Sequence, residues 1–306
     1  MELAQLKSFV TIAETLSFTA AAKALHVTQP ALSYQMSRLE TELKTKLFDR
    51  TGRRIALTPE GELFLPLAQS VLLRADESLR ILRDHLGTEL GVVRFGCNPS
   101  VAANLAPPVI AAFRAEQPNV RLEMTEAGDA ELQEGVRNGS LDFAIVTAPG
   151  FPRYLDITPL GSENLLLVTS AQHRLAGRKS VRLRELADET FVMASDTYNI
   201  SAHIVEACRR AGFEPRVVCQ GGSNDAARSL VRHGTGVAIL PSIAVRGSHS
   251  EGLAVIPLED NLTRELNLIR GKDRALTRAA RAFMERLQAY VTKQLTRMPA
   301  SRRAAG

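Results

Sequence analysis

Between Leu3 and Leu86, hydrophobic residues recur three or four positions apart, which is the spacing of one face of a helix. Ser17 is a candidate N-cap for a short alanine-rich helix that follows the first one. Thr28 is a candidate N-cap for a third helix, whose first turn contains Pro30. The pattern predicts three consecutive helices separated by tight turns.

A short hairpin and a long helix are predicted next. Leu47 and Phe48 lead into the hairpin, and Gly52 lies at its tip. Thr58 then precedes a proline at the first position of a helix that continues to about Leu86. Helices of this length usually pack against a partner helix, so a helix–helix contact is expected there.

From Gly91 onward the pattern changes to short apolar runs that alternate with helical segments. This rhythm predicts a parallel α/β sheet, in two successive units. The predicted strands are 92–96, 120–125, 143–146, 165–168, 191–193, 217–219, 237–240 and 266–269. The predicted helices are 105–116, 130–138, 183–187, 200–211, 226–233 and 276–294, and the tail 297–306 is predicted to be disordered.

The composition of the 306 residues is that of an ordinary globular protein, with 45% hydrophobic and 23% charged residues. The N-terminus lacks the pattern of a signal peptide, and no apolar stretch approaches the roughly 20 residues of a membrane span. The three cysteines form no C-x-x-C pair and no Cys/His cluster, which disfavours structural zinc. We therefore expect a cytoplasmic protein without a metal, a cofactor or a membrane partner.

Positive charge is concentrated behind the third predicted helix. The net charge is +5, and residues 44–54 contain five Lys or Arg residues against the single acid Asp49. Basicity alone suggests only an anionic partner, and a run of charges is often a solvated surface. The position of this segment directly after a helix-turn-helix pattern favours contact with nucleic acid.

The sequence from Phe18 to Glu40 reads FTAAAKALHVTQPALSYQMSRLE and has the features of a helix-turn-helix. Small alanines stand where two helices meet, and polar residues begin the second helix, from which they could reach base edges in the major groove. Gln29 and Ser33 lie four apart and share one helix face. An ordinary helical hairpin is the alternative for this stretch alone.

Longer motifs make the N-terminal region resemble the DNA-binding domain of LysR-type transcription regulators. The matching segments are an opening L..F, then SFTAAAKALHVTQPALS, RLE.EL...LFDR, and LTPEG before a long helix. One position departs from the family pattern, because Tyr34 stands where the family often has arginine. The resemblance implies a sequence-specific transcriptional regulator with an N-terminal winged helix-turn-helix, and not an enzyme.

The same resemblance implies which residues meet double-stranded DNA at a promoter or operator. From the third helix these would be Thr28, Gln29, Pro30, Ser33, Tyr34, Gln35 and Arg38. The wing would contribute Arg50, Arg53 and Arg54, near phosphates or the minor groove. The long helix would pair two chains, which gives a homodimer and, by further assembly, a homotetramer. RNA polymerase is a further candidate partner.

The C-terminal region resembles the family's effector domain, which has two α/β lobes of the periplasmic-binding-protein type. Ligands in such folds lie in the cleft where strand carboxyl ends and helix N-termini converge. We expect a small anionic effector there, such as a small organic acid. The expected domains are a winged helix-turn-helix at 1–58, a linker helix at 59–87, a first lobe at 91–161 plus 265–296, and a second lobe at 162–264.

Residues at that cleft are predicted from the strands that they follow. From the first lobe they are Asn98, Pro99, Ser100, Glu126, Gly128 and Thr147, and from the second lobe Ser195, Thr197, Asn199, His203, Gly222 and Ser223. For each one, a role in a helix cap or a turn is the alternative. As a set on one edge of both sheets, they favour a cleft lining. Effector binding would then tilt the lobes and change how the oligomer holds DNA.

Two other functions remain open at this point. The α/β pair alone would fit a solute-binding module, and a cleft could belong to an enzyme, although no dinucleotide fingerprint and no Ser-His-Asp set is visible. Some members of the resembled family sense peroxide through a cysteine just before the second-lobe helix. This chain has Tyr198 there, while Cys208 lies within the helix and Cys219 ends the next strand. Redox sensing is therefore not expected.

Overall fold

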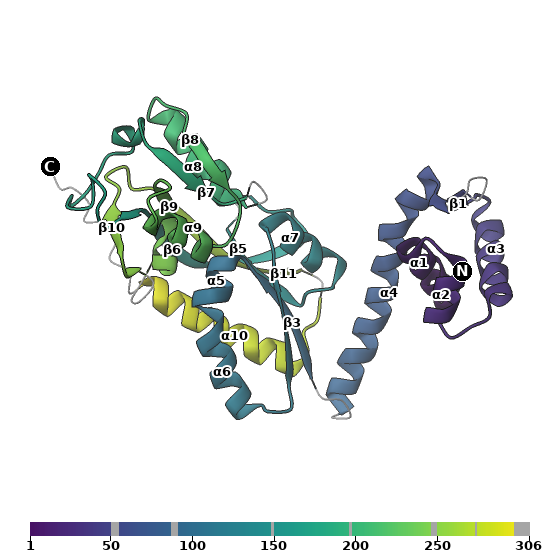
Figure 1. The fold of residues 1–306 in the computed structure, drawn as a ribbon. Helices are drawn as coiled ribbons and strands as arrows, with labels where there is room; N and C mark the ends of the chain where they lie inside the picture. Colours follow the sequence, from purple (N-terminus) through teal and green to yellow (C-terminus); the bar gives the residue numbers. More distant parts are fainter. Residues whose placement is uncertain are drawn as a thin grey trace. The chain divides into compact units, whose positions relative to one another are not determined.

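The computed structural model describes residues 1–49, 55–86, 91–147, 150–195, 198–245, 250–272 and 274–296. The chain folds as two compact units (Figure 1). A helical unit comprises Met1–Glu89 with Asn138–Ser140, and an α/β unit comprises Leu90–Arg137 and Leu141–Gly306. The sequence-based predictions for Arg50, Arg53, Arg54, Thr197 and the tail 297–306 concern residues outside the described ranges.

The helical unit follows the predicted order of elements. It contains α1 (Leu3–Thr15), α2 (Phe18–Ala24), α3 (Gln29–Leu43), β1 (Phe48–Asp49), β2 (Ala56–Leu57) and α4 (Pro59–Leu86). The Ser17 hydroxyl accepts a hydrogen bond from the Ala20 N–H at 3.2 Å, and the Thr28 hydroxyl accepts one from the Ala31 N–H at 3.4 Å. Both predicted N-caps are therefore confirmed.

One hydrophobic core holds α3 in place. Leu32, Met36 and Leu39 on one face of α3 are fully buried together with Leu6 and Phe9 of α1. Alanines of α2 fill the space where the helices meet, as the pattern of small residues predicted. Because the apolar face of α3 packs into this core, its opposite face can contact solvent or a ligand.

The start of α4 is fixed to the strand before it. The Thr58 hydroxyl donates to the Lys46 carbonyl at 2.6 Å and accepts from the Gly61 N–H at 3.0 Å, so Thr58 is the predicted cap. A Cβ at Gly61 would lie 2.2 Å from the Leu47 carbonyl oxygen. The close approach of these two segments explains why glycine stands in the LTPEG motif.

The α/β unit begins with strands and helices in alternation. Its first elements are β3 (Val92–Cys97), α5 (Pro99–Asn104), α6 (Ala106–Glu116), β4 (Arg121–Glu126), α7 (Asp129–Asn138) and β5 (Phe143–Val146). Next come β6 (Leu155–Ser170), η1 (Leu183–Leu186), β7 (Thr190–Met193), α8 (Asn199–Arg210), β8 (Arg216–Gln220) and α9 (Asn224–Arg232). The last are β9 (Ala238–Pro241), η2 (Ser242–Val245), β10 (Leu253–Pro257), β11 (Thr263–Gly271) and α10 (Arg278–Thr296).

The main sheet is mixed, which corrects the prediction of a parallel one. Its strand order is β10-β6-β11-β5-β3-β4, with β9 also paired to β6. β3 is parallel to both β4 and β5, as predicted, but β11 is antiparallel to β5 and to β6. The reason is that the chain re-enters the first lobe through β11 from the opposite direction.

Two long strands, β6 and β11, run side by side and connect the lobes. They pair from Thr263 opposite Asn164 to Gly271 opposite Leu155. The sequence predicted only 165–168 of β6, and it did not predict β10 or the short helix α5. In the second lobe β7 and β8 are parallel and are joined to the main sheet by a bridge from Phe191 to Val237.

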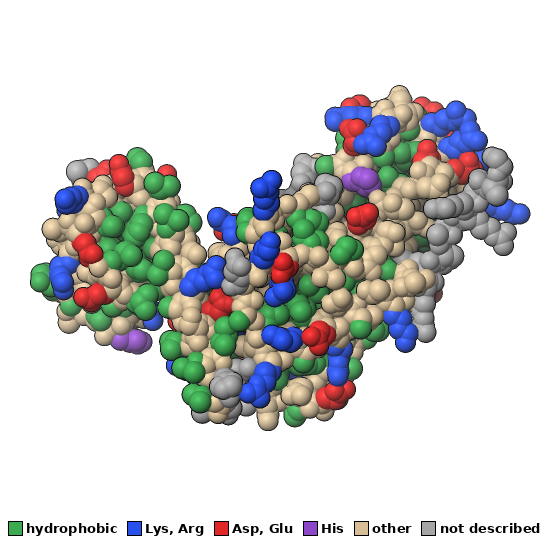
Figure 2. All heavy atoms as spheres, turned by 180° about the vertical axis from the view of Figure 1, so that it is seen from behind, with side chains coloured by type: hydrophobic (Ala, Val, Ile, Leu, Met, Phe, Trp, Pro, Cys, Tyr) green, Lys and Arg blue, Asp and Glu red, His purple; other side chains and the backbone are tan. Residues whose placement is uncertain are grey.

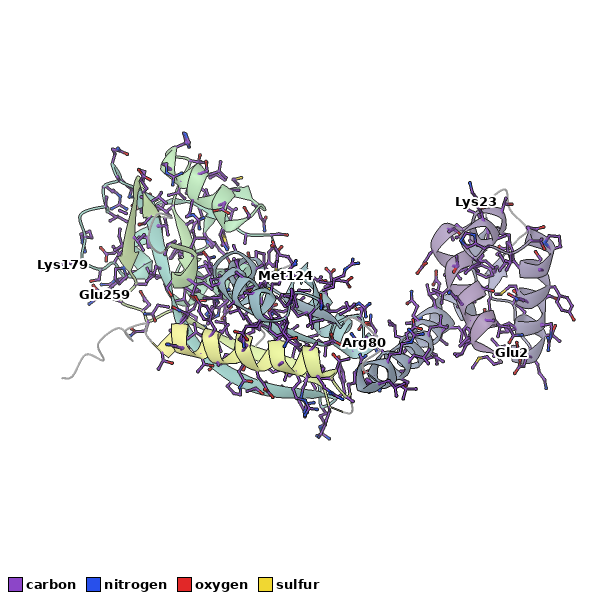
Figure 3. The ribbon with its side chains drawn as sticks, turned by 90° about the horizontal axis from the view of Figure 1, so that it is seen from below. Glu2, Lys23, Arg80, Met124, Lys179 and Glu259 are labelled. Atoms are coloured by element: carbon purple, nitrogen blue, oxygen red, sulfur yellow. The ribbon has the colours of Figure 1, made fainter. Side chains whose placement is uncertain are left out.

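Each lobe has its own hydrophobic core. In the first lobe Phe95, Phe113 and Phe283 pack together, with the Phe283 ring centroid 4.9 Å from that of Phe95 and 5.1 Å from that of Phe113. The final helix α10 therefore packs into the first lobe, and it is seen from below in Figure 3. A separate core surrounds Phe191 and Cys208 in the second lobe, where Figure 3 labels Lys179 and Glu259. In the described part of the chain, no helix has the length and hydropathy needed to cross a membrane.

Candidate functional site

The polar start of α3 faces solvent. Thr28, Gln29, Pro30 and Arg38 are exposed, and the Tyr34 side chain is 66% exposed. Ser33 is half-buried, and its hydroxyl accepts a hydrogen bond from the Gln29 side-chain amide at 2.9 Å. Five of the seven residues predicted here are therefore exposed to solvent. A sixth, Ser33, is hydrogen-bonded to the exposed Gln29.

Gln35, the seventh predicted α3 residue, is held against α1. Its side-chain oxygen lies 2.6 Å from the hydroxyl of Ser8, which is itself almost fully buried. Gln35 is only half-buried, so part of its amide still reaches the surface. Its contact with α1 restricts its rotamers more than sequence spacing alone indicated.

A buried carboxylate, Glu40, fixes the end of α3 to the first strand of the hairpin. It accepts hydrogen bonds from the backbone N–H groups of Leu47 at 3.0 Å and Phe48 at 3.4 Å, and it pairs with the Lys46 ammonium at 3.0 Å. The side chain of Glu40 is 1% exposed. The RLE motif contains Glu40, but local sequence pattern does not predict this contact, because its partners lie seven and eight residues away.

The helix α4 presents hydrophobic residues to solvent along much of its length. Gly61 and Ala68 are buried on the face toward the helical core, where Phe64, Leu65 and Leu72 also pack. The exposed apolar residues of α4 are Leu63, Leu67, Val71, Leu79, Leu82 and Leu86. Figure 2 shows hydrophobic side chains gathered on a face of the helical unit. Such a stripe on a long helix is typical of a helix–helix interface.

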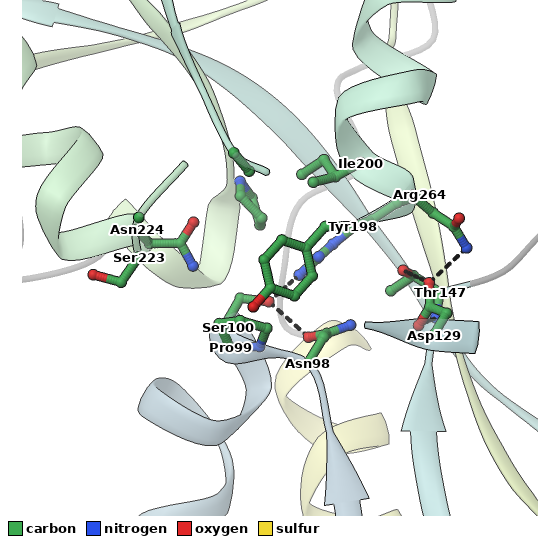
Figure 4. A pocket seen from close by; sticks show the side chains of 14 residues that line it. Asn98, Pro99, Ser100, Asp129, Thr147, Tyr198, Ile200, Ser223, Asn224 and Arg264 are labelled. Carbon is green, nitrogen blue, oxygen red and sulfur yellow. Dashed lines mark hydrogen bonds between the residues drawn. The ribbon is translucent and has the colours of Figure 1, made fainter. Parts of the chain in front are cut away.

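In the α/β unit, a small cavity of about 40 Å³ lies where strand ends from both lobes converge (Figure 4). Seven of the residues predicted for the cleft line it: Asn98, Pro99, Ser100, Thr147, Asn199, Gly222 and Ser223. Sequence reasoning missed the other seven lining residues, which are Asp129, Ala194, Tyr198, Ile200, Asn224, Pro241 and Arg264. The two lobes contribute to one lining, as their strand ends predicted.

A larger hollow of about 560 Å³ adjoins the cavity and shares Thr147, Asn199, Ile200 and Arg264 with it. The predicted residue His203 lines this hollow, and its Nε2 lies 2.9 Å from the Thr263 carbonyl oxygen. The predicted residues Glu126, Gly128 and Ser195 line neither space.

The deepest polar group at the site is an ion pair between two neighbouring strands. Arg264 on β11 lies directly opposite Glu163 on β6, and its guanidinium donates to one Glu163 oxygen at 2.9 and 2.7 Å. The other Glu163 oxygen accepts from the Ser242 hydroxyl at 3.0 Å and from the Ile243 N–H at 2.9 Å. The two charged side chains are 8% and 0% exposed, so this pair is fully desolvated.

The ion pair reaches the cavity through Ser100. Arg264 Nη2 donates to the Ser100 hydroxyl at 2.6 Å, and this hydroxyl donates to the Asn98 side-chain oxygen at 3.0 Å. The Asn98 oxygen also accepts from the Val101 N–H at 3.4 Å, which makes Asn98 the N-cap of α5. The Asn98 side-chain nitrogen is buried and has no hydrogen-bond partner among the described residues. A buried donor without a partner is costly unless a bound group accepts from it.

Asp129 links strand, helix and the opposite lobe. One of its oxygens accepts from the Thr147 N–H at 2.9 Å. The other accepts from the Thr147 hydroxyl at 2.8 Å and from the Asn199 side-chain amide at 2.7 Å. Asp129 begins α7 of the first lobe, whereas Asn199 begins α8 of the second. The carboxylate therefore joins the two lobes at the cavity.

Tyr198 at the cavity and two buried cysteines of the α/β unit have pKa values shifted toward their neutral forms. Burial, together with the negative charges of Glu126 and Glu131, raises the pKa of Tyr198 above its ordinary value. Burial also raises the pKa of the Cys97 thiol to about 12 and that of Cys208 to about 11. Both cysteines are buried and unpaired, so they lack the exposed thiolate of a redox sensor. Nowhere in the described ranges do three or more His, Cys, Asp or Glu residues gather as metal ligands.

Comparison with known proteins decides the family. Residues 3–62 match the bacterial regulatory helix-turn-helix protein, lysR family, and residues 87–292 match the LysR substrate binding domain. The chain belongs to the LysR family. The LysR-type pattern thus extends over both units, and the resemblance inferred from N-terminal motifs is confirmed.

Individual relatives agree with this assignment along nearly the whole chain. The uncharacterized HTH-type transcriptional regulator YwbI of Bacillus subtilis is 34% identical over 95% of this chain and 97% of its own length. The transcriptional dual regulator GltC of the same organism is 33% identical over 96% of this chain and 98% of its own length. Among solved structures, a full-length OxyR variant from Pseudomonas aeruginosa has a TM-score of 0.70 and 26% identity, over 95% of this chain and 94% of that one.

These findings establish a DNA-binding transcriptional regulator of the LysR type, with an N-terminal helix-turn-helix and a C-terminal effector-binding domain. They favour neither of the two other functions considered from the sequence. The LysR helix-turn-helix distinguishes the chain from a solute-binding module, and its relatives are named as transcriptional regulators rather than enzymes.

Proposed function

We propose that this LysR-type regulator reads operator DNA with the start of α3 and responds to a small effector held between its two C-terminal lobes. The DNA-binding part of the proposal rests on the two faces of α3: its apolar face is fully buried in the core, and its polar face is exposed. Such a helix can enter the major groove without exposing its core.

Within α3, Gln29 and Ser33 are proposed to contact base edges, since they share the exposed face and hydrogen-bond to each other. Thr28, Pro30, Tyr34 and Arg38 would lie against the sugar-phosphate backbone. Arg50, Arg53 and Arg54 are proposed as the wing, by their place between β1 and β2 in the sequence. Bacterial DNA lies in the cytoplasm, so we propose that the protein acts there.

The exposed apolar stripe of α4 is proposed as the surface that pairs two copies of the chain. A homodimer would present two copies of α3 to two half-sites, as expected for a two-fold operator. Assembly into a homotetramer and contact with RNA polymerase are further parts of the proposal. One solved structure with the same fold is described as full-length CbnR complexed with its target DNA.

The effector is proposed to lie between the lobes, against Asn98, Ser100, Thr147 and Asn199. Polar groups from both lobes converge there, and one of them is a buried donor without a partner. A small organic acid could accept a hydrogen bond from the side-chain nitrogen of Asn98, which is that donor. Because the lining comes from both lobes, an effector would change their relative orientation and thereby the oligomer.

A footprint on the promoter region of the protein's own gene tests the DNA-binding part. We expect protection of a two-fold related sequence by the full-length protein at moderate salt. Gln29→Ala should relax base preference, whereas Arg38→Ala should weaken binding to all sequences and reduce the salt slope by about 1. Equal binding to operator and random DNA at every salt concentration would contradict the proposal.

A further inference from the structure

We infer that the effector is a zwitterion of the amino-acid type, whose ammonium group lies against Asp129 and whose carboxylate is received by the side-chain amide of Asn98. This inference rests on the proposed effector cleft and names the chemical class that the cleft selects. It refines the expectation of a small organic acid by requiring a cationic nitrogen beside the acid group.

The described residues of the site offer no unpaired positive charge to a simple anion. Arg264 is the single Lys or Arg residue among the described lining residues; its charge is paired with Glu163, and its Nε and Nη2 donors bond to Glu163 and Ser100. The other oxygen of Glu163 accepts hydrogen bonds from Ser242 and Ile243, which hold this carboxylate beside Arg264. The ion pair therefore positions the Ser100 hydroxyl at the cavity, and its two charges compensate each other.

Asp129 lines the cavity without a cationic partner among the described residues. Asp129 is 3% exposed, and its carboxylate forms no ion pair with any Lys or Arg in the described part of the chain. Its three hydrogen bonds come from neutral donors on Thr147 and Asn199. A carboxylate has about four lone-pair sites, so one acceptor position remains. A cationic N–H directed at that position would gain a charge-assisted hydrogen bond in a water-poor site.

Other acids add to the negative potential around Asp129. Glu206 and Glu265 line the adjoining hollow, where the other described polar side chains with basic groups are Arg264, already paired, and His203. Glu126 and Glu131 act on Tyr198, the aromatic side chain that covers the cavity from the second lobe. A ligand carrying only negative charge would be repelled by this set, whereas an ammonium group would be attracted.

The acid end of the ligand is assigned from the opposite side of the cavity. Asn98 Nδ2 is the buried donor without a partner, and Figure 4 shows the Asn98 and Ser100 side chains beside each other under Tyr198. A carboxylate oxygen there would accept from Asn98. The cavity of about 40 Å³ holds only the polar head groups, so the side chain of the ligand would extend into the hollow of about 560 Å³.

The test compares matched compounds on the full-length wild-type protein. Each common amino acid is measured by thermal shift and calorimetry beside its deaminated acid and its decarboxylated amine. We expect at least one amino acid to bind about tenfold or more tightly than both of its counterparts. Equal or tighter binding of the deaminated acid, or binding by none of the amino acids, would overturn the inference. Operator binding is measured separately, so failure of the proposed DNA-binding function is distinguished from failure of this inference.

A pair of variants locates the ammonium group. Asp129→Asn should weaken binding of that amino acid by about tenfold or more, while its effect on the deaminated acid should be small. Glu131→Gln removes one negative charge from the same helix without touching the cavity, and it should change affinity by less than about threefold. Unchanged amino-acid binding by a folded Asp129→Asn protein would overturn the assignment. If this variant fails to fold, the wild-type comparison still decides.

Discussion

The side-chain amide of Asn199 donates a hydrogen bond of 2.7 Å to the carboxylate of Asp129, and this bond crosses from the second lobe to the first. It lies at the boundary between the small cavity and the larger hollow, because Asn199 lines both. In the proposed site, a ligand's ammonium group would therefore share Asp129 with Asn199 or displace Asn199. The bond therefore joins the two lobes at the proposed effector site.

Removing this bond should loosen the cleft. Asn199→Ala takes away a neutral donor and should cost about 1 kcal/mol in local stability. Asn199→Asp should have a larger effect, because it places a second carboxylate against Asp129. Hydrogen exchange measured by mass spectrometry should be faster than in the wild type at the start of α8 in both variants, and fastest in Asn199→Asp. Unchanged exchange in Asn199→Asp would show that the lobes do not depend on this contact.

The buried ion pair between Glu163 and Arg264 should be essential for stability. Glu163→Ala leaves a desolvated guanidinium without its partner and should cost about 3–5 kcal/mol in the unfolding free energy of the α/β unit. Urea unfolding followed by circular dichroism measures the loss. Glu259→Gln is the matched control, since the Arg182–Glu259 pair lies at the surface, and its effect should be barely measurable. Similar losses of unfolding free energy in the two variants would contradict the burial of the Glu163–Arg264 pair.

In the helical unit, Glu40 should hold the hairpin to α3. Glu40→Ala leaves the N–H groups of Leu47 and Phe48 without their acceptor, which should cost about 2 kcal/mol. We expect a lower melting temperature of this unit and weaker operator binding. Glu42→Ala, two residues further along the same helix and exposed, should change neither property appreciably. Retention of full stability by Glu40→Ala would show that water replaces the carboxylate.

Local sequence signals predicted most elements of the fold, whereas contacts between distant residues had to come from the structure. The caps Ser17, Thr28 and Thr58 act within three residues of their partners, so spacing was sufficient to find them. The first half of β6 was missed because Pro159 and Gly161 indicate breaks in a strand. Its pairing with β11 supplies the strand register that no local pattern encodes.

The same distinction explains the cleft. Residues that directly follow strands, such as Asn98 and Thr147, were predicted because strand ends meet at one sheet edge. Arg264 was missed because it lies inside a strand, and its importance comes from Glu163, which is 101 residues away in the chain. Asp129 has the ordinary appearance of an acid in the first turn of a helix, so nothing local indicated its contact with Asn199.

The cysteines should resist alkylation in the folded protein. The pKa of about 12 at Cys97 and about 11 at Cys208 means that both thiols are protonated at pH 8, with about one thiolate per thousand Cys208 side chains. Their reaction with iodoacetamide should therefore rise with pH throughout the range from 7 to about 10. Mass mapping should find Cys219, which is partly exposed, modified first. A Cys208–Cys219 disulfide formed by peroxide and tied to altered DNA binding would contradict the expectation that this chain does not sense peroxide.

The exposed stripe of α4 should control the oligomeric state. Leu79 and Leu82 lie three apart on one helix face, and Leu86 continues that face by one further turn. Leu79→Glu with Leu82→Glu would place charges in the proposed interface, and burial of unpaired charge is strongly unfavourable. Light scattering should show a shift to monomers, with unchanged circular dichroism. Because two half-sites are then no longer bound together, operator affinity should fall by about a hundredfold.

Arg80→Glu changes the charge of a neighbouring residue outside the apolar stripe and serves as the control. If the leucine variant remained dimeric, pairing through α4 would be wrong, while the DNA-binding role of α3 would stand untouched.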